Sequence, residues 1–127
     1  MHYAFCITTE GSTLPDLESD EYWQKMINQG LIRFFLLKAL RDESTYGYVL
    51  SKRIEEISWG ACKPTQGTLY PALGQLERDS YLTVHATKYK GRERKIYQIT
   101  EKGKHAFRAA AKNYGQAIPL LNKAIVL

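Results

Sequence analysis

The spacing of the apolar residues changes after Asp79, and this change limits the folds that the chain can adopt. Between Glu21 and Asp79 the apolar residues recur every three or four positions, which is the spacing of helices that bury one face. From Leu82 to Thr100 they alternate with polar residues, as in strands with one buried face. The sequence therefore predicts several helices followed by a β-hairpin, an α+β fold that is mostly α.

A long first helix is predicted from Glu21 to Arg41. Its apolar residues follow helical spacing, and further apolar residues beside them widen the buried stripe toward all sides. We expect a helix of this kind to lie in the centre of the core, with the other elements around it. The residues of the stripe are Ile27, Leu31, Phe34, Leu37 and Leu40, with Ile32, Phe35, Leu36 and Ala39 beside them.

Two shorter helices are predicted next. Residues 42–44 are expected to supply a turn and an N-cap for the second helix. Thr65 is expected to cap the third, which runs to about Asp79. Pro71 removes one backbone hydrogen bond inside that helix, so we expect a bend or a loose first turn. The inward faces consist of Gly47, Leu50, Ile54 and Ile57 in the second helix and of Leu69, Leu73 and Leu76 in the third.

A last helix follows the hairpin, and Thr100 is expected to cap it. Its apolar positions step alternately by four and three residues, which is the spacing of a helix that packs against another helix. Pro119 is expected to kink this helix, so the pattern is most regular as far as Ala117. The positions in the repeat are Gly103, Phe107, Ala110, Tyr114, Ala117, Leu121 and Ala124.

Charge is distributed unevenly along the 127 residues, whose net charge is +5. Residues 1–21 contain five acidic side chains and no Lys or Arg, so the remainder of the chain is strongly basic. The hairpin loop is the densest basic segment, and its cations suit contacts with phosphates. The alternative is a charged turn that only faces solvent, but five cations within eight residues repel one another. These cations are Lys88, Lys90, Arg92, Arg94 and Lys95, opposed only by Glu93.

Three helices followed by a hairpin with a basic tip are typical of a winged helix-turn-helix, in which one helix enters the major groove and the wing contacts the backbone. Three segments resemble the PadR-like transcriptional regulators. The second helix contains YGYVL at 46–50, the third contains GTLYPAL at 67–73, and the wing contains GRERKIY at 91–97 before TEKG at 100–103. The resemblance implies a dimeric repressor or activator of the compact branch of the family, in which the C-terminal helix pairs with a second subunit.

The resemblance also implies where DNA is contacted. It places Thr65, Gln66, Thr68, Leu69 and Tyr70 at the start of the recognition helix. Gln66 is the candidate base reader because its amide can pair bidentately with adenine, whereas the hydroxyls suit phosphates or capping bonds. Further candidates are Lys63, Tyr46 and the cations of the wing. Tyr46 and Tyr48 are also expected to pack the second helix on the first.

The predicted organisation has three parts: an acidic N-terminal extension (1–20), a winged-helix domain (21–100) and a dimerisation helix (101–127). Its candidate dimer-interface residues are Phe107, Ala110, Tyr114, Ala117 and Leu121. The expected partners are double-stranded DNA at an operator or promoter and a second copy of the chain. Two alternatives remain open. One is a protein-interaction module in which the acidic extension engages a partner. The other is a regulator whose effector enters an apolar slot near Phe107 and Tyr114.

No catalytic, cofactor or metal site is predicted. His2, His85 and His105 share no metal-ligand spacing with Cys, Asp or Glu, and no phosphate-binding glycine loop or serine elbow is present. Cys6 and Cys62 are expected to be reduced thiols that pack as small apolar groups. No apolar run approaches the roughly 20 residues that span a bilayer, and no signal peptide is apparent, so we expect a cytoplasmic protein.

Overall fold

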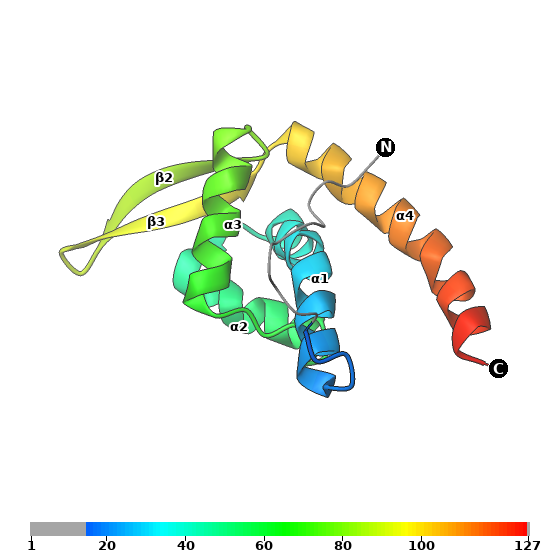
Figure 1. Ribbon diagram of the computed structural model, residues 1–127. Coiled ribbons are helices and arrows are strands. Elements are labelled where there is room, and N and C mark those ends of the chain that lie inside the picture. Colours follow the sequence, from blue (N-terminus) through cyan, green and yellow to red (C-terminus); the bar gives the residue numbers. More distant parts are fainter. Residues whose placement is uncertain (1–14, 127) are drawn as a thin grey trace.

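The computed structural model describes residues 15–126, which contain four helices and a small antiparallel sheet (Figure 1). The predicted order of three helices, a hairpin and a last helix is confirmed, and so is the fold class. The elements are α1 (Asp20–Asp42), β1 (Thr45–Tyr46), α2 (Gly47–Ile57), α3 (Gln66–Arg78), β2 (Leu82–Tyr89), β3 (Arg92–Ile99) and α4 (Glu101–Ile125).

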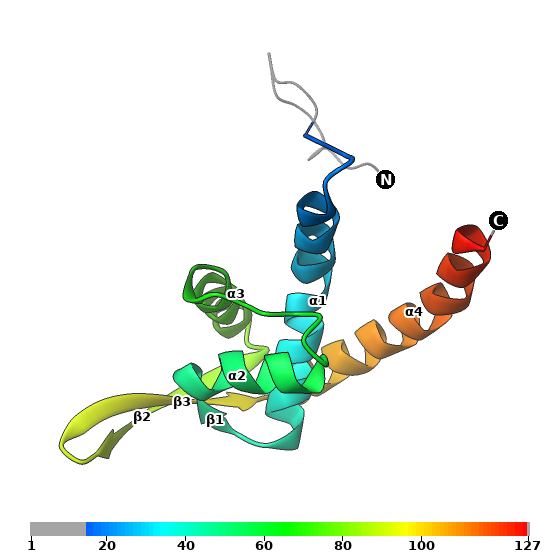
Figure 2. The same cartoon turned by 90° about the horizontal axis from the view of Figure 1, so that it is seen from below.

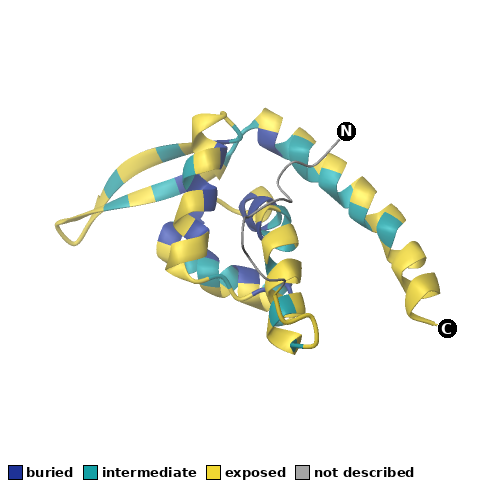
Figure 3. Ribbon diagram, viewed as in Figure 1, coloured by how far each residue is buried: buried dark blue, intermediate teal, exposed yellow. Residues whose placement is uncertain are grey.

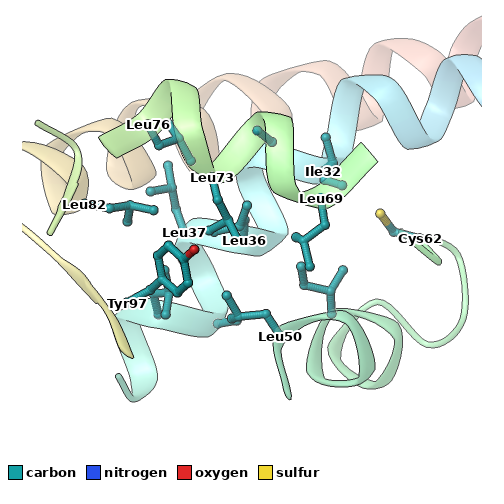
Figure 4. Close-up of a cluster of buried hydrophobic side chains, with 14 residues drawn as sticks. Ile32, Leu36, Leu37, Leu50, Cys62, Leu69, Leu73, Leu76, Leu82 and Tyr97 are labelled. Atoms are coloured by element: carbon teal, nitrogen blue, oxygen red, sulfur yellow. The ribbon is translucent and has the colours of Figure 1, made fainter. Parts of the chain in front are cut away.

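The second half of α1 is the centre of the core, as predicted. Leu36 and Ala39 have no exposed surface, and Leu40 is 2% exposed. Each fully buried leucine stabilises the folded state by about 1.5–3 kcal/mol relative to an exposed one. The elements are therefore held in place by a shared contact with this half of α1. Figure 4 draws the buried residues around Leu36 and Leu37, including Leu50 of α2, Leu69 and Leu73 of α3, Leu82 of β2 and Tyr97 of β3.

The first half of α1 does not belong to this core. It projects away from α2 and α3 (Figure 2), and Ile27 is 50% exposed. The prediction that the buried stripe begins at Ile27 was therefore wrong for this half. Helical spacing identifies an apolar face, but it does not say whether another part of the same chain covers that face.

The segment between α1 and α2 forms a third strand that the apolar spacing did not predict. Thr45 pairs with Tyr97 and Tyr46 with Ile96, so β1 adds to the edge of β3. Helix α2 then begins at Gly47, and its N-cap residue, Tyr46, makes no side-chain capping bond. The expectation of an N-cap within residues 42–44 was therefore wrong. A strand of two residues is too short to produce an alternating pattern.

Helix α3 ends in a turn that aims the chain into the wing. The amide of Tyr81 bonds to the carbonyl of Leu76 at 2.8 Å, and the amide of Ser80 bonds to the carbonyl of Glu77 at 3.0 Å. These two bonds form a Schellman motif, in which the residue after the C-cap adopts a left-handed conformation. Ser80 occupies that position with φ of +66°. The direction in which β2 leaves α3 is thus set by the backbone.

The start of α4 is fixed against the same turn. Thr100 caps α4 as predicted, because its hydroxyl accepts a hydrogen bond from the amide of Gly103 at 3.0 Å. The helix continues through Pro119 to Ile125, and α3 likewise continues through Pro71. At Gly103 the backbone approaches the carbonyl of Tyr81 so closely that an added Cβ would stand 2.3 Å from that oxygen.

We expect Gly103→Ala to lower the free energy of unfolding by roughly 1–3 kcal/mol, because the new methyl group forces α4 away from Tyr81. Gly115→Ala is the matched control in the same helix, since a Cβ there meets nothing within 4 Å. That control should be neutral or stabilising by up to about 1 kcal/mol through its higher helix propensity. Urea denaturation of both variants measures the difference. Equal stabilities would show that α4 is not seated on the turn as described.

Candidate nucleic-acid interface

The wing is a regular hairpin that extends well beyond the helices (Figure 1). Its strands pair from Leu82 with Ile99 out to Tyr89 with Arg92. The two-residue tip consists of Lys90 and Gly91, with φ values of +52° and +77°. Positive φ at both positions is the geometry of a type I′ turn, which matches the twist of paired strands. The five predicted cations therefore lie on the outer half of one regularly paired hairpin.

These cations differ in how they are surrounded. Lys88, Lys90, Arg92 and Lys95 are exposed, whereas Arg94 is half-buried. None of the five forms an ion pair with another residue in the range 15–126. Glu93 is the one carboxylate among residues 86–99, so the wing carries an excess of positive charge.

The start of α3 places some of its predicted residues in solvent and one in the core. Thr65, Gln66 and Thr68 are exposed. Leu69 is 1% exposed and packs among the core residues. Its assignment as a DNA-binding residue was therefore wrong, because a side chain that faces α1 and α2 cannot reach a groove. The same helical spacing that places Leu73 and Leu76 inward also places Leu69 inward.

Thr65 stands at the N-cap position of α3, but its side chain makes no capping bond to the helix backbone. Its hydroxyl instead pairs with the hydroxyl of Thr68 at 2.7 Å. Thr65 therefore occupies the predicted N-cap position, but it does not make the predicted capping bond. Two exposed hydroxyls are thus held together at the first turn, where the backbone amides of a helix favour an anion.

Two side-chain hydrogen bonds hold the loop that leads into α3. The hydroxyl of Ser58 accepts a hydrogen bond from the amide of Cys62 at 3.0 Å, and the hydroxyl of Ser51 donates to the carbonyl of Pro64 at 2.9 Å. The Cys62 thiol is fully buried, and this burial raises its pKa above the usual value. Cys62 thus packs as an apolar group, as predicted, whereas Cys6 lies outside the described residues. Lys63 is exposed in this loop.

A cleft of about 480 Å³ separates α3 from the wing. Its walls come from the start of α2, from Tyr70 of α3 and from residues 92–95 of β3. The elements meet at Gly47, where an added Cβ would stand 3.2 Å from the Tyr97 ring and 3.3 Å from the Tyr70 ring. Burial raises the pKa of Tyr97, and negative charge at Tyr70 and Glu77 raises it further. Tyr70 is 40% exposed, so its ring also faces the cleft.

Tyr46 and Tyr48 face the wing and not α1. Their rings stack on each other with centroids 5.8 Å apart. The guanidinium of Arg94 lies 5.6 Å from the Tyr46 ring and 5.2 Å from the Tyr48 ring. The prediction that these tyrosines pack α2 on α1 was therefore wrong. Arg94 is 46 residues from Tyr48, and no local pattern in the sequence links the two.

The predicted seam of α4 is partly covered within the chain. Phe107 stacks on Phe34 of α1 with ring centroids 5.3 Å apart, and Tyr114 meets the same ring edge-on at 5.2 Å. The hydroxyl of Tyr114 also donates a hydrogen bond to the carbonyl of Gly30. Ala110 and Ala117 are half-buried, and Leu121 is exposed. The spacing was interpreted as a dimer interface, but the helix that Phe107 and Tyr114 pack against is α1 of the same chain.

The arrangement matches a known family. The profile of the family described as "Transcriptional regulator PadR-like family" matches residues 36–109, more than half of the chain. The chain belongs to the PadR-like family of transcriptional regulators. The match covers the end of α1, then β1, α2, α3 and the wing, and the start of α4. The resemblance found in the three sequence segments is therefore confirmed.

Relatives and solved structures agree with the PadR-like assignment. The transcriptional regulator YqjI of Escherichia coli is 31% identical over 80 residues, which are 63% of this chain and 37% of that protein. The transcriptional regulator Rv3488 of Mycobacterium tuberculosis is 32% identical over 75 residues, 59% of this chain and 67% of that one. A transcriptional regulator from Clostridium thermocellum shares the fold with a TM-score of 0.72 at 23% identity, covering 79% and 98% of the two chains.

A PadR-like regulator from Bacillus cereus also shares the fold, with a TM-score of 0.69 at 21% identity over 80% of this chain and 98% of that chain. The family and the named relatives are transcriptional regulators, so a regulator rather than an enzyme is confirmed. Over residues 15–126 no helix has both the length and the apolar composition to cross a bilayer. In that same range no three His, Cys, Asp or Glu side chains gather as metal ligands would.

Proposed function

We propose that this PadR-like regulator binds double-stranded DNA as a homodimer, with the start of α3 in the major groove and the wing on the flanking backbone. The observation that carries the proposal is the placement of two surfaces on either side of one cleft. Tyr70, which follows the exposed first turn of α3, lines one side, and the exposed Arg92 and Lys95, which form no ion pair in the described chain, line the other. A sugar–phosphate strand that passes between a major-groove helix and a wing needs both surfaces.

Within this interface the side chains have different roles. Gln66 reads a base, because it is the exposed amide at the first position of α3 and an amide pairs bidentately with adenine. Thr65, Thr68 and Tyr70 bind phosphate through their hydroxyls. Lys63 and the exposed cations of the wing add sequence-independent attraction to the backbone.

The dimer is proposed from apolar surfaces that the chain leaves uncovered. On the first half of α1, Trp23 is 51% exposed and Ile27 is 50% exposed. Near the end of α4, Leu121 is 59% exposed and Ile125 is 73% exposed. Figure 2 shows the start of α1 and the end of α4 on the same side of the molecule and leaning away from each other, and Figure 3 shows the end of α4 exposed throughout. The two surfaces cannot cover each other within one copy, but a two-fold axis brings α4 of one copy onto α1 of the other.

Repression is the regulatory role that we propose. A dimer that places α3 and a wing on each half-site covers one or two turns of duplex and excludes other proteins from them. The alternative effector slot near Phe107 and Tyr114 has no comparable support, because Phe34 packs against both rings there.

Selection of bound sequences from a random duplex pool at physiological salt tests the DNA proposal. Wild type should enrich an inverted repeat, because a two-fold dimer presents two identical reading helices. Gln66→Ala should relax one position in each half-site, at a cost of roughly 1–3 kcal/mol. Gln75→Ala, at the far end of the same helix, should leave the selected site unchanged. Failure of wild type to enrich any sequence would contradict the proposal and favour a protein-interaction module.

Light scattering combined with size-exclusion chromatography tests the dimer. Leu121→Asp with Ile125→Asp should reduce the measured mass to that of one chain, 14.6 kDa, because buried carboxylates without partners are costly. The control is Lys90→Asp, which places a carboxylate at the exposed tip of the wing, away from both surfaces. It should leave the dimer intact. A dimer that survives the α4 substitutions would place the interface elsewhere.

A further inference from the structure

Arg94 is set apart from the other cations of the wing by its surroundings. Its guanidinium lies 4.8 Å from the centroid of the Tyr89 ring, in addition to its contacts with Tyr46 and Tyr48. Its Nη1 also donates a hydrogen bond to the hydroxyl of Tyr48 at 2.9 Å. Three rings and one hydroxyl thus surround a single guanidinium, which is half-buried where its neighbours are exposed.

The strand register imposes this cluster. Arg94 pairs with Thr87, so Tyr89 is its diagonal neighbour on the same face of the hairpin. Tyr46 pairs with Ile96, two residues along β3 from Arg94, and therefore also lies on that face. Tyr48 then approaches from the first turn of α2. The cluster thus joins both strands of the wing to the segment that begins α2.

The outer part of the wing has little else to hold it to the helices. Strand β1 ends at Tyr46, so the backbone pairing of β3 with the body of the protein stops at Ile96. Between the residues that the structure describes, the Arg94–Tyr48 bond is the one side-chain hydrogen bond from residues 86–95 to a helix. A guanidinium is planar, weakly hydrated and well suited to stacking on aromatic rings, so it serves this role better than an ammonium.

We propose that Arg94 is a positioning residue that fixes the angle of the wing against the start of α2, and that the exposed Arg92 and Lys95 contact phosphate instead. That Arg94 holds the wing in place is inferred from contacts within the free protein. Its consequence for DNA affinity rests on the proposed function. A wing fixed in advance loses less conformational freedom on binding, so release of Arg94 weakens binding without removing a phosphate contact.

Hydrogen exchange of the full-length free protein tests the clamp. In Arg94→Gln the amides of residues 88–95 should exchange about tenfold faster than in wild type, because the hairpin moves more freely. Arg94→Lys keeps the charge but loses the planar stack, so it should not restore protection. The matched control, Arg92→Gln, should leave exchange unchanged. Unchanged exchange in Arg94→Gln, or full protection in Arg94→Lys, would overturn the proposal.

The salt dependence of binding to a selected duplex then separates positioning from contact. Arg92→Gln should lower the slope of log affinity against log salt by about one unit, as expected for a lost phosphate contact. Arg94→Gln should weaken binding by roughly tenfold with the slope of wild type and an unchanged melting temperature. A lowered slope in Arg94→Gln would make it a phosphate contact and overturn the proposal. If wild type binds no DNA, the proposed function fails, while the exchange result still decides the clamp.

Discussion

Burial of the second half of α1 is the constraint on which the rest of the structure depends. Leu36 and Leu40 of this half contact a core shared with α2, α3 and the sheet, and Phe34 of the same half carries α4. The proposed function requires α3, the wing and α4 to be held in fixed relation, and the second half of this one helix contacts all three.

The position of the wing relative to α3 depends on contacts at both ends of the hairpin. At its base, the Schellman turn at Ser80 and the seat of Gly103 on Tyr81 fix where β2 begins and α4 starts. Further out, the cluster around Arg94 ties the hairpin to the start of α2. The positive charge of the wing is therefore carried on a hairpin that is held at its base and near its middle, and Tyr70 lines the cleft beside it.

Local patterns in the sequence predicted most of the fold. The spacing of the apolar residues, the turn residues and the cap at Thr100 were enough to predict the helices and the hairpin. These signals come from residues a few positions apart in the sequence. Contacts between distant segments were not predictable. Strand β1 exists because β3 offers an edge to Thr45 and Tyr46, and Arg94 meets Tyr48 only after the hairpin has formed. Leu69 shows a different limit. A family motif marks where the helix begins, but the phase of the helix decides which of its side chains face away from the core.

Site-directed photo-cross-linking to a duplex carrying the selected site tests most directly whether α3 and the wing lie on DNA as proposed. A Cys6→Ser background leaves Cys62, whose thiol is buried and has a raised pKa. A photoreactive group is then attached to Gln66→Cys or to Arg92→Cys. We expect cross-links from position 66 to bases at two symmetric places and from position 92 to the backbone flanking them. Cross-links from position 66 that are absent, or spread along the duplex without preference, would contradict it.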